Sequence, residues 1–291
     1  MTAPTGQPIV VGIDGSAESL DAVRWAARTA SRRGAPLEIV HALDFSALLA
    51  GGVVPPPEEM KDVLRDRGGR SLRTAAELAS AQGVPGATTR LDPGRAAHAL
   101  VDASKTAALL VVGSSGKGRL TGLLAGSVAS AVSAHASCDT VIVRGDAWDE
   151  AETAGRPVLA GIDGGKASSR ILAVALDEAK SRHVPLVVVH AWADDPPPHE
   201  PDHPENHESV AGAGHRLLAD RLGDHGTGDV EVDRVVVRSH PRRELIERSD
   251  AAQIVVLGDR GRGGFPDLLL GSTGQALLHN AACPVYLVRT A

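Results

Sequence analysis

The sequence predicts an α/β protein built from two tandem doubly wound, Rossmann-like domains, each a five-stranded parallel sheet flanked by helices. Its composition is that of a globular chain, because 43% of the 291 residues are hydrophobic and 23% are charged. The same series of motifs occurs twice, about 145 residues apart. Within each copy, short runs rich in Val, Ile and Leu alternate with longer amphipathic segments, which is typical of βαβ units.

The repeat is clearest at the two ends of each copy. Val10–Gly15 returns as Leu159–Gly164, displaced by 149 residues, and Cys138–Arg144 returns as Cys283–Arg289, displaced by 145. A repeat of this length is domain-sized, so it indicates a duplicated domain and not a solenoid.

We expect one domain over residues 1–145, a second over residues 157–291 and a linker over residues 146–156. The linker segment is acidic and shows no hydrophobic periodicity.

Hydrophobic periodicity predicts the elements of each domain. Continuous aliphatic runs such as Ala108–Val112 indicate strands covered on both faces, and the apolar face that includes Ala22, Val23 and Ala26 indicates a helix. In the first copy the predicted strands lie near residues 8–13, 37–42, 86–91, 108–113 and 140–144, and the predicted helices near 17–33, 58–82, 95–106 and 123–135. In the second copy the predicted helices lie near residues 167–182, 206–224, 241–250 and 271–282. Such a sheet binds its ligands at the carboxyl ends of the strands.

Hydropathy, charge and cysteine content argue against several classes of protein. No run approaches 18 apolar residues and the first eight residues lack the features of a signal peptide, so we expect a cytoplasmic protein with no membrane partner. Residues 1–145 carry 15 Lys and Arg against 13 Asp and Glu, whereas residues 146–291 carry 15 against 23, so we expect no nucleic-acid partner. Cys138 and Cys283 fit no disulfide or metal motif and are expected to be reduced and packed beneath the closing strands.

A set of glycines follows the fourth strand of each copy. The spacing Gly-x-x-Gly-x9-Gly-Ser is formed by Gly113, Gly116, Gly126 and Ser127, and again by Gly258, Gly261, Gly271 and Ser272. Glycine permits close approach and positive φ, so the first two glycines of each set are expected to form a nest for phosphate, with Lys117 or Arg262 adding charge. The last Gly-Ser pair lies at a predicted helix start, where free amides attract anions. The alternative is that these are turn glycines, with the two serines as helix N-caps.

An aspartate closes the first strand of each copy. Asp14 and Asp163 lie at the same edge of the sheet as the glycines, where each could accept hydrogen bonds from a ribose or adenine, or cap the following helix. The chain contains neither a Walker P-loop nor a Gly-x-Gly-x-x-Gly fingerprint after the first strand.

Together these motifs resemble the universal stress protein family, whose ATP-binding members carry the same glycine spacing after the fourth strand and an aspartate at the end of the first. The resemblance covers essentially the whole chain, as a tandem pair. It implies ATP with Mg²⁺ as the ligand, and a stress-response role in which nucleotide occupancy tunes conformation or partner binding. It also implies that the closing strands pair the two domains as an internal pseudo-dimer, and leaves open whether that unit forms a homodimer.

The resemblance further implies the nucleotide-binding residues, with adenine near the end of the first two strands and ribose and phosphates at the glycines. In the first domain they are Ile13, Asp14, Ala42, Val112, Gly113, Gly116, Gly126, Ser127 and Val128. In the second domain they are Ile162, Asp163, Ala191, Leu257, Gly258, Gly261, Gly271, Ser272 and Thr273. Two departures weaken the second site: Gly165 replaces the hydroxyl of Ser16, and Asp259 brings a negative charge to the expected phosphate nest.

Two other functions remain open, a module of the same fold that binds no nucleotide and a slow ATP hydrolase. We assign no catalytic residue, because no Walker pair, base-orienting pair or metal cluster accompanies the glycines. The histidines within His199–His207 could hold a transition metal, but we interpret the segment as a solvated loop and expect no metal site. His41 and His190, at the end of the second strand of each copy, are interpreted as packing or hydrogen-bonding residues.

Overall fold

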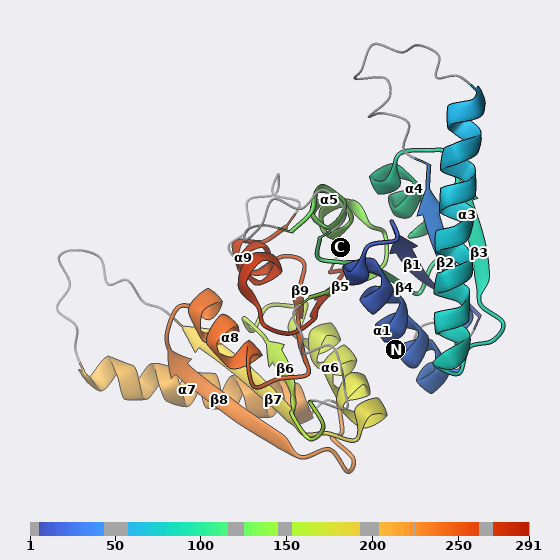
Figure 1. Cartoon of the computed structure of the whole chain (residues 1–291). Helices are drawn as coiled ribbons and strands as arrows, with labels where there is room; N and C mark the ends of the chain where they lie inside the picture. Colours follow the sequence, from blue (N-terminus) through green and yellow to red (C-terminus); the bar gives the residue numbers. More distant parts are fainter. Residues whose placement is uncertain are drawn as a thin grey trace. The chain divides into compact units, whose positions relative to one another are not determined.

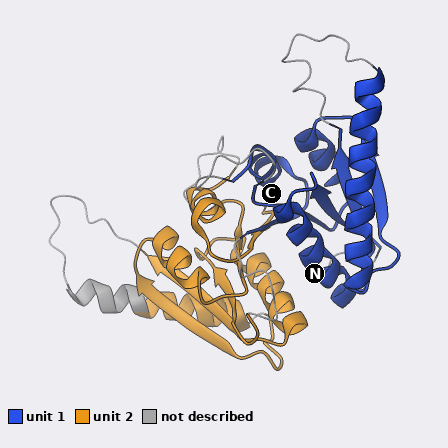
Figure 2. Ribbon diagram, viewed as in Figure 1, with its two compact units in different colours: residues 1–144 blue, residues 145–291 orange. Residues whose placement is uncertain are grey.

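A computed structural model describes residues 6–43, 58–115, 125–144, 153–192, 204–223, 225–261 and 270–290, with the backbone alone over residues 204–211. The chain divides into two compact units, residues 1–144 and 145–291 (Figure 2). Each unit is an α/β domain with a parallel sheet, as Figure 1 shows element by element.

The first unit confirms the predicted doubly wound architecture. Its elements are β1 (Ile9–Ile13), α1 (Ala17–Arg33), β2 (Leu37–Ala42), α3 (Glu58–Ala81), β3 (Thr88–Asp92), α4 (Ala96–Ala103), β4 (Leu109–Gly113), α5 (Ser127–His135) and β5 (Asp139–Val143). The strand order is β3-β2-β1-β4-β5, and all four pairs are parallel. Helices α1 and α3 pack against each other, as do α4 and α5, which fits right-handed crossovers on the two faces of the sheet.

The second unit repeats this plan. Its elements are β6 (Val158–Gly161), α6 (Ser168–Arg182), β7 (Leu186–Trp192), α7 (Pro204–Gly223), β8 (Val232–Arg238), α8 (Pro241–Ser249), β9 (Ile254–Gly258), α9 (Ser272–Asn280) and β10 (Val285–Val288). The strand order is β8-β7-β6-β9-β10, again parallel throughout.

The core of each domain is aliphatic, because the central strands are buried on both faces. Every residue of β1 and β5 is buried, and within the described ranges Trp25 is the one aromatic among the largest fully buried side chains. Cys283 is buried and Cys138 is half-buried, and neither forms a disulfide.

Local signals fix several helix ends. The Ser16 hydroxyl caps α1 by accepting a hydrogen bond from the Ser19 amide at 3.2 Å, and Gly34 ends the helix in the left-handed region at φ 60°. The expected helix near 123–135 begins only at Ser127, because the backbone of Gly126 is extended, with φ −61° and ψ 160°. None of the helices described here is both long and apolar enough to cross a membrane.

The segment before β6 packs onto the second domain. Thr153 is buried, and its carbonyl accepts a hydrogen bond from the Gln253 amide group at 3.1 Å. The Arg156 guanidinium donates to the Asp250 carbonyl at 2.9 Å. Residues 153–156, expected as linker, therefore make fixed contacts with this domain.

Candidate functional site

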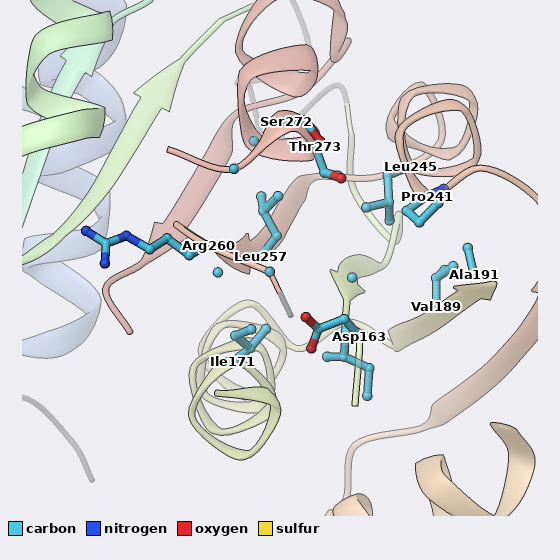
Figure 3. A pocket seen from close by; sticks show the side chains of 16 residues that line it. Asp163, Ile171, Val189, Ala191, Pro241, Leu245, Leu257, Arg260, Ser272 and Thr273 are labelled. Carbon is cyan, nitrogen blue, oxygen red and sulfur yellow. The ribbon is translucent and has the colours of Figure 1, made fainter. Parts of the chain in front are cut away.

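A cavity of about 490 Å³ lies in the second domain where the strand order reverses, between β6 and β9 (Figure 3). Its lining comes from the carboxyl ends of three strands and from the starts of two helices, α8 and α9, with one residue from α6. The lining residues are Gly161, Ile162, Asp163, Ile171, Val189, Ala191, Pro241, Leu245, Leu257, Gly258, Arg260, Gly261, Gly271, Ser272, Thr273 and Gly274. This is the position at which open α/β sheets bind their ligands.

All nine residues expected at the second site line this one cavity. They are Ile162, Asp163, Ala191, Leu257, Gly258, Gly261, Gly271, Ser272 and Thr273. The fold therefore brings together residues that are as much as 111 positions apart in the sequence.

Asp163 follows β6 and is fixed by the turn after it. Its Oδ1 accepts a hydrogen bond from the Gly165 amide at 2.8 Å and lies 3.5 Å from the Ser168 hydroxyl. Its carboxyl group points between Leu257 and Ile171 in Figure 3. The turn itself requires glycine at 164, which has φ 78°.

The corresponding turn of the first domain is held in the same way. Asp14 Oδ1 accepts from the amide of Ser16 at 2.9 Å and from its hydroxyl at 2.6 Å. Because the N-cap of α1 is Ser16, the interpretation of Asp14 as the cap is wrong. The change to Gly165 in the second domain loses a hydroxyl but keeps the backbone hydrogen bond to the aspartate.

The start of α9 presents backbone amides to the cavity. The first hydrogen bond within the helix runs from the Gln275 amide to the Gly271 carbonyl, at 3.0 Å. The amides of Ser272, Thr273 and Gly274 therefore have no acceptor within the helix, and all three residues line the cavity. Such a helix start attracts anions.

The N-cap residues are glycines, so the alternative that Ser127 and Ser272 cap their helices is wrong. Gly126 and Gly271 hold the N-cap positions with extended backbones, and neither cap makes a side-chain hydrogen bond. Each serine is the first residue of its helix.

The loop after the fourth strand is tied to the following helix in both domains. The Gly271 amide donates to the Asp259 carbonyl at 2.8 Å, and the Gly126 amide donates to the Ser114 carbonyl at 2.7 Å. These bonds bring the last glycine of each motif beside the residue that follows the first.

The described motif glycines do not use positive φ, which corrects the expected nest. None of the described motif glycines Gly113, Gly126, Gly258, Gly261 and Gly271 adopts the left-handed region. A Cβ on Gly113 would lie 2.8 Å from the Glu18 carbonyl oxygen, at the start of α1. Packing of the loop against that helix therefore requires glycine at 113.

Asp259 does not face the cavity, so its expected place in the phosphate nest is wrong. It is 1% exposed and does not line the cavity. Its Oδ2 accepts from the Arg289 guanidinium at 3.0 Å, and its Oδ1 accepts from the Thr290 amide at 3.1 Å and from the Thr290 hydroxyl at 2.5 Å.

In the first domain, the predicted residues also lie at the carboxyl ends of adjacent strands. Ile13 ends β1 and pairs with His41, Ala42 ends β2, and Val112 and Gly113 end β4. Gly126, Ser127 and Val128 form the start of α5. Gly116 and Lys117, like Arg262 of the second domain, lie outside the described residues.

Of the two histidines singled out at the second strands, His190 has a hydrogen-bonding contact. His190 Nδ1 lies 3.1 Å from the Ile162 carbonyl oxygen, which confirms the interpretation as a hydrogen-bonding residue. Residues 199–203 and the side chain of His207 lie outside the described part. Within that part, no three His, Cys, Asp or Glu residues gather closely enough to hold a metal ion.

Sequence reasoning missed seven lining residues, namely Gly161, Ile171, Val189, Pro241, Leu245, Arg260 and Gly274. The sequence repeat contained part of the information needed to locate Gly161 and Leu245. A Cβ on Gly161 would lie 2.6 Å from Leu245, and a Cβ on Gly12 would lie 2.5 Å from Leu100. The repeated glycine thus makes room for a repeated leucine that covers the strand end.

Comparisons with known proteins identify the family of the chain. The sequence model of the Universal stress protein family matches residues 6–144 and again residues 155–289. A universal stress protein of Mycobacterium tuberculosis strain H37Rv is 39% identical over 288 residues, which cover 97% of this chain and 96% of the relative. One of Mycolicibacterium smegmatis is 38% identical over 291 residues, with the same coverage of 97% and 96%.

The fold is shared with solved members. The crystal structure of a universal stress protein from Archaeoglobus fulgidus covers 98% of each chain with a TM-score of 0.74, at 18% identity. The two matches in tandem, the full-length relatives and the shared architecture lead to one conclusion: the chain belongs to the universal stress protein family, as a two-domain member.

Proposed function

We propose that the protein binds ATP with Mg²⁺ in the cavity of the second domain, and that nucleotide occupancy tunes its conformation or partner binding in a stress response. The observation that carries this proposal is the juxtaposition, in one cavity, of an apolar wall and a helix start with three amides free of helical partners.

The cavity offers different chemistry to each part of a nucleotide. Ile162, Val189 and Ala191, at the ends of β6 and β7, supply an apolar surface for a purine ring. Asp163 supplies a carboxylate for ribose hydroxyls. The start of α9 supplies positive charge for phosphates. Arg260 also lines the cavity, with its guanidinium directed away from the other lining side chains in Figure 3. A volume of about 490 Å³ is within the range of small-molecule sites.

Mg²⁺ fits such a site as a companion of the phosphates. It prefers oxygen ligands, keeps several waters and is often bound through substrate phosphates. Since the described residues hold no cluster of metal-ligating side chains, the phosphate oxygens would supply most of its ligands. When bound, the ion neutralises phosphate charge.

We extend the proposal to the first domain, where Ile13, Asp14 and Ala42 correspond to the residues around the purine and Gly126 and Ser127 to those at the phosphates. No catalytic role is proposed for any residue. The internal pseudo-dimer, a homodimer and a cytoplasmic location stay predictions.

Calorimetric titration of the nucleotide-stripped protein with ATP and Mg²⁺ tests the proposal. Ala191→Trp would fill the cavity, and Ala42→Trp is the matched change in the first domain. We expect saturable binding by the unchanged chain and the loss of one site in each variant.

The same titration separates the alternatives. If the folded chain binds no ATP, the proposal fails and a non-nucleotide module of the same fold remains. If ATP binds but Ala191→Trp leaves both sites intact, the cavity is not the site. Phosphate release assayed in parallel would detect a slow hydrolase.

A further inference from the structure

Asp259 lies at a junction between three parts of the second domain. Its amide donates to the Val288 carbonyl at the end of β10, at 2.9 Å, and its carbonyl accepts from the Gly271 amide at the start of α9. Its carboxylate binds Arg289 and Thr290. The residue thus connects the end of β9 to the segment after β10 and to the helix start that lines the cavity.

The Asp259 carboxylate is almost completely buried and forms an ion pair with a neighbouring guanidinium. Asp259 is 1% exposed, and Arg289, whose side chain is 15% exposed, forms its ion pair at 3.0 Å. Arg289 is itself held in place, since its carbonyl accepts a hydrogen bond from Arg170 of α6. A buried carboxylate is costly unless it is paired and hydrogen-bonded, and this one is both.

The Asp259–Arg289 ion pair has no counterpart in the first domain. Asp259 and Arg260 stand where the first domain has Ser114 and Ser115, while Arg289 corresponds to Arg144. Relative to the first domain, the second therefore carries one more negative and one more positive charge near the candidate phosphate site. Arg260 lines the cavity and Asp259 does not, and the Asp259 carboxylate is turned toward Arg289.

We infer that Arg289 is a positioning residue of the second site: it cancels the charge of Asp259 and, with Thr290, holds that carboxylate out of the cavity, so that Asp259 sets no negative charge against the polyanionic end of the ligand at the start of α9. This inference rests on the proposed function. It assigns Asp259 a role in connecting the loop and no contact with the ligand.

The test uses the full chain with its first site blocked by Ala42→Trp, titrated with ATP, ADP, AMP and adenosine. In that background, Arg289→Gln leaves Asp259 without its cation. Because the interaction between charges scales with ligand charge, we expect ATP affinity to fall about tenfold or more, ADP and AMP affinity to fall progressively less, and adenosine affinity to stay within about twofold. The loss should shrink at high salt.

A second variant separates charge cancellation from folding and from direct contact. Asp259→Ser with Arg289→Gln removes both charges and restores the serine of the first domain. We expect it to recover ATP affinity to within about twofold of the background chain. Arg65→Gln, an exposed residue of α3, controls for the change in net charge and is expected to leave the four affinities unchanged.

Each outcome has a distinct meaning. A graded loss that the double variant reverses supports the inference. Equal losses for all four ligands, no loss, or a loss that the double variant does not reverse would overturn it, the last because Arg289 would then act on the ligand directly or through folding. If the background chain binds none of the four ligands, the proposed function fails as well.

Discussion

Replacing Gly113 by alanine tests whether the first glycine of the motif is required for packing. The new Cβ would lie 2.8 Å from the Glu18 carbonyl oxygen, 2.9 Å from its carbonyl carbon and 3.2 Å from the Ser19 nitrogen. These are backbone atoms of the first turn of α1, so they cannot move aside as a flexible side chain can. Overpacking of this kind costs about 1–3 kcal/mol, offset by about 0.4–1 kcal/mol because alanine restricts the unfolded chain.

Taking the middle of each range, about 2 and 0.7 kcal/mol, the net expectation is a loss of about 1.3 kcal/mol. At roughly 4 °C per kcal/mol for a domain of this size, the melting temperature of the first domain should fall by about 5 °C. Gly126→Ala is the matched control: its Cβ would meet Ser114 and Ser115 at 3.5 and 3.6 Å, in ordinary contact, and its φ of −61° suits any residue. Thermal unfolding followed by circular dichroism, without ligand, measures both.

We expect Gly126→Ala to melt within a few degrees of the unchanged chain, or slightly above it. If Gly113→Ala is as stable as the unchanged chain, or if both variants lose the same stability, the packing argument is refuted. Because Gly113→Ala combines a packing defect with any effect on binding, Gly126→Ala and its counterpart Gly271→Ala are the better variants for ligand studies.

Three further predictions concern single contacts. Ser16→Ala removes the cap of α1 and should cost about 0.5–2 kcal/mol in urea unfolding, whereas an unchanged midpoint would show that the cap contributes nothing. Arg182→Met removes the ion pair that Arg182 forms with Glu178, which is 0% exposed, and should cost about 3–5 kcal/mol; adding Glu178→Leu should recover most of this, and a failure to recover would contradict the pairing argument. Arg260→Ala should weaken ATP binding more than adenosine binding in calorimetry, and equal effects would place Arg260 away from the phosphates.

The parallel sheets could be predicted because their strands are buried on both faces. Runs such as Leu109–Gly113 are continuously apolar, and the repeat supplies a second observation of every element. The helix start was less predictable at α5. There the expected helix begins before the true start at Ser127, and the extended backbone of the N-cap Gly126, which no periodicity reports, sets the first turn.

Much of the site was accessible from sequence for a related reason. Residues at the carboxyl ends of parallel strands meet at one edge of the sheet, so Asp163, Ala191 and Gly258 could be placed together from the sequence. Lining residues on the crossover helices, such as Leu245, could not, because their position depends on how each helix packs over the strand ends. The direction of the Asp259 side chain was also mispredicted. It depends on Arg289, which is 30 residues away and adjoins Asp259 only because β10 pairs with β9.

The central claim is that the cavity at the ends of β6, β7 and β9 holds an adenine nucleotide with its phosphates at the start of α9. A crystal structure of the chain grown with saturating ATP and Mg²⁺ tests this most directly. We predict density for a purine beside Ile162 and Ala191 and for phosphates against the amides of Ser272 and Thr273. An empty cavity under these conditions, or a nucleotide bound elsewhere on the domain, would contradict the account.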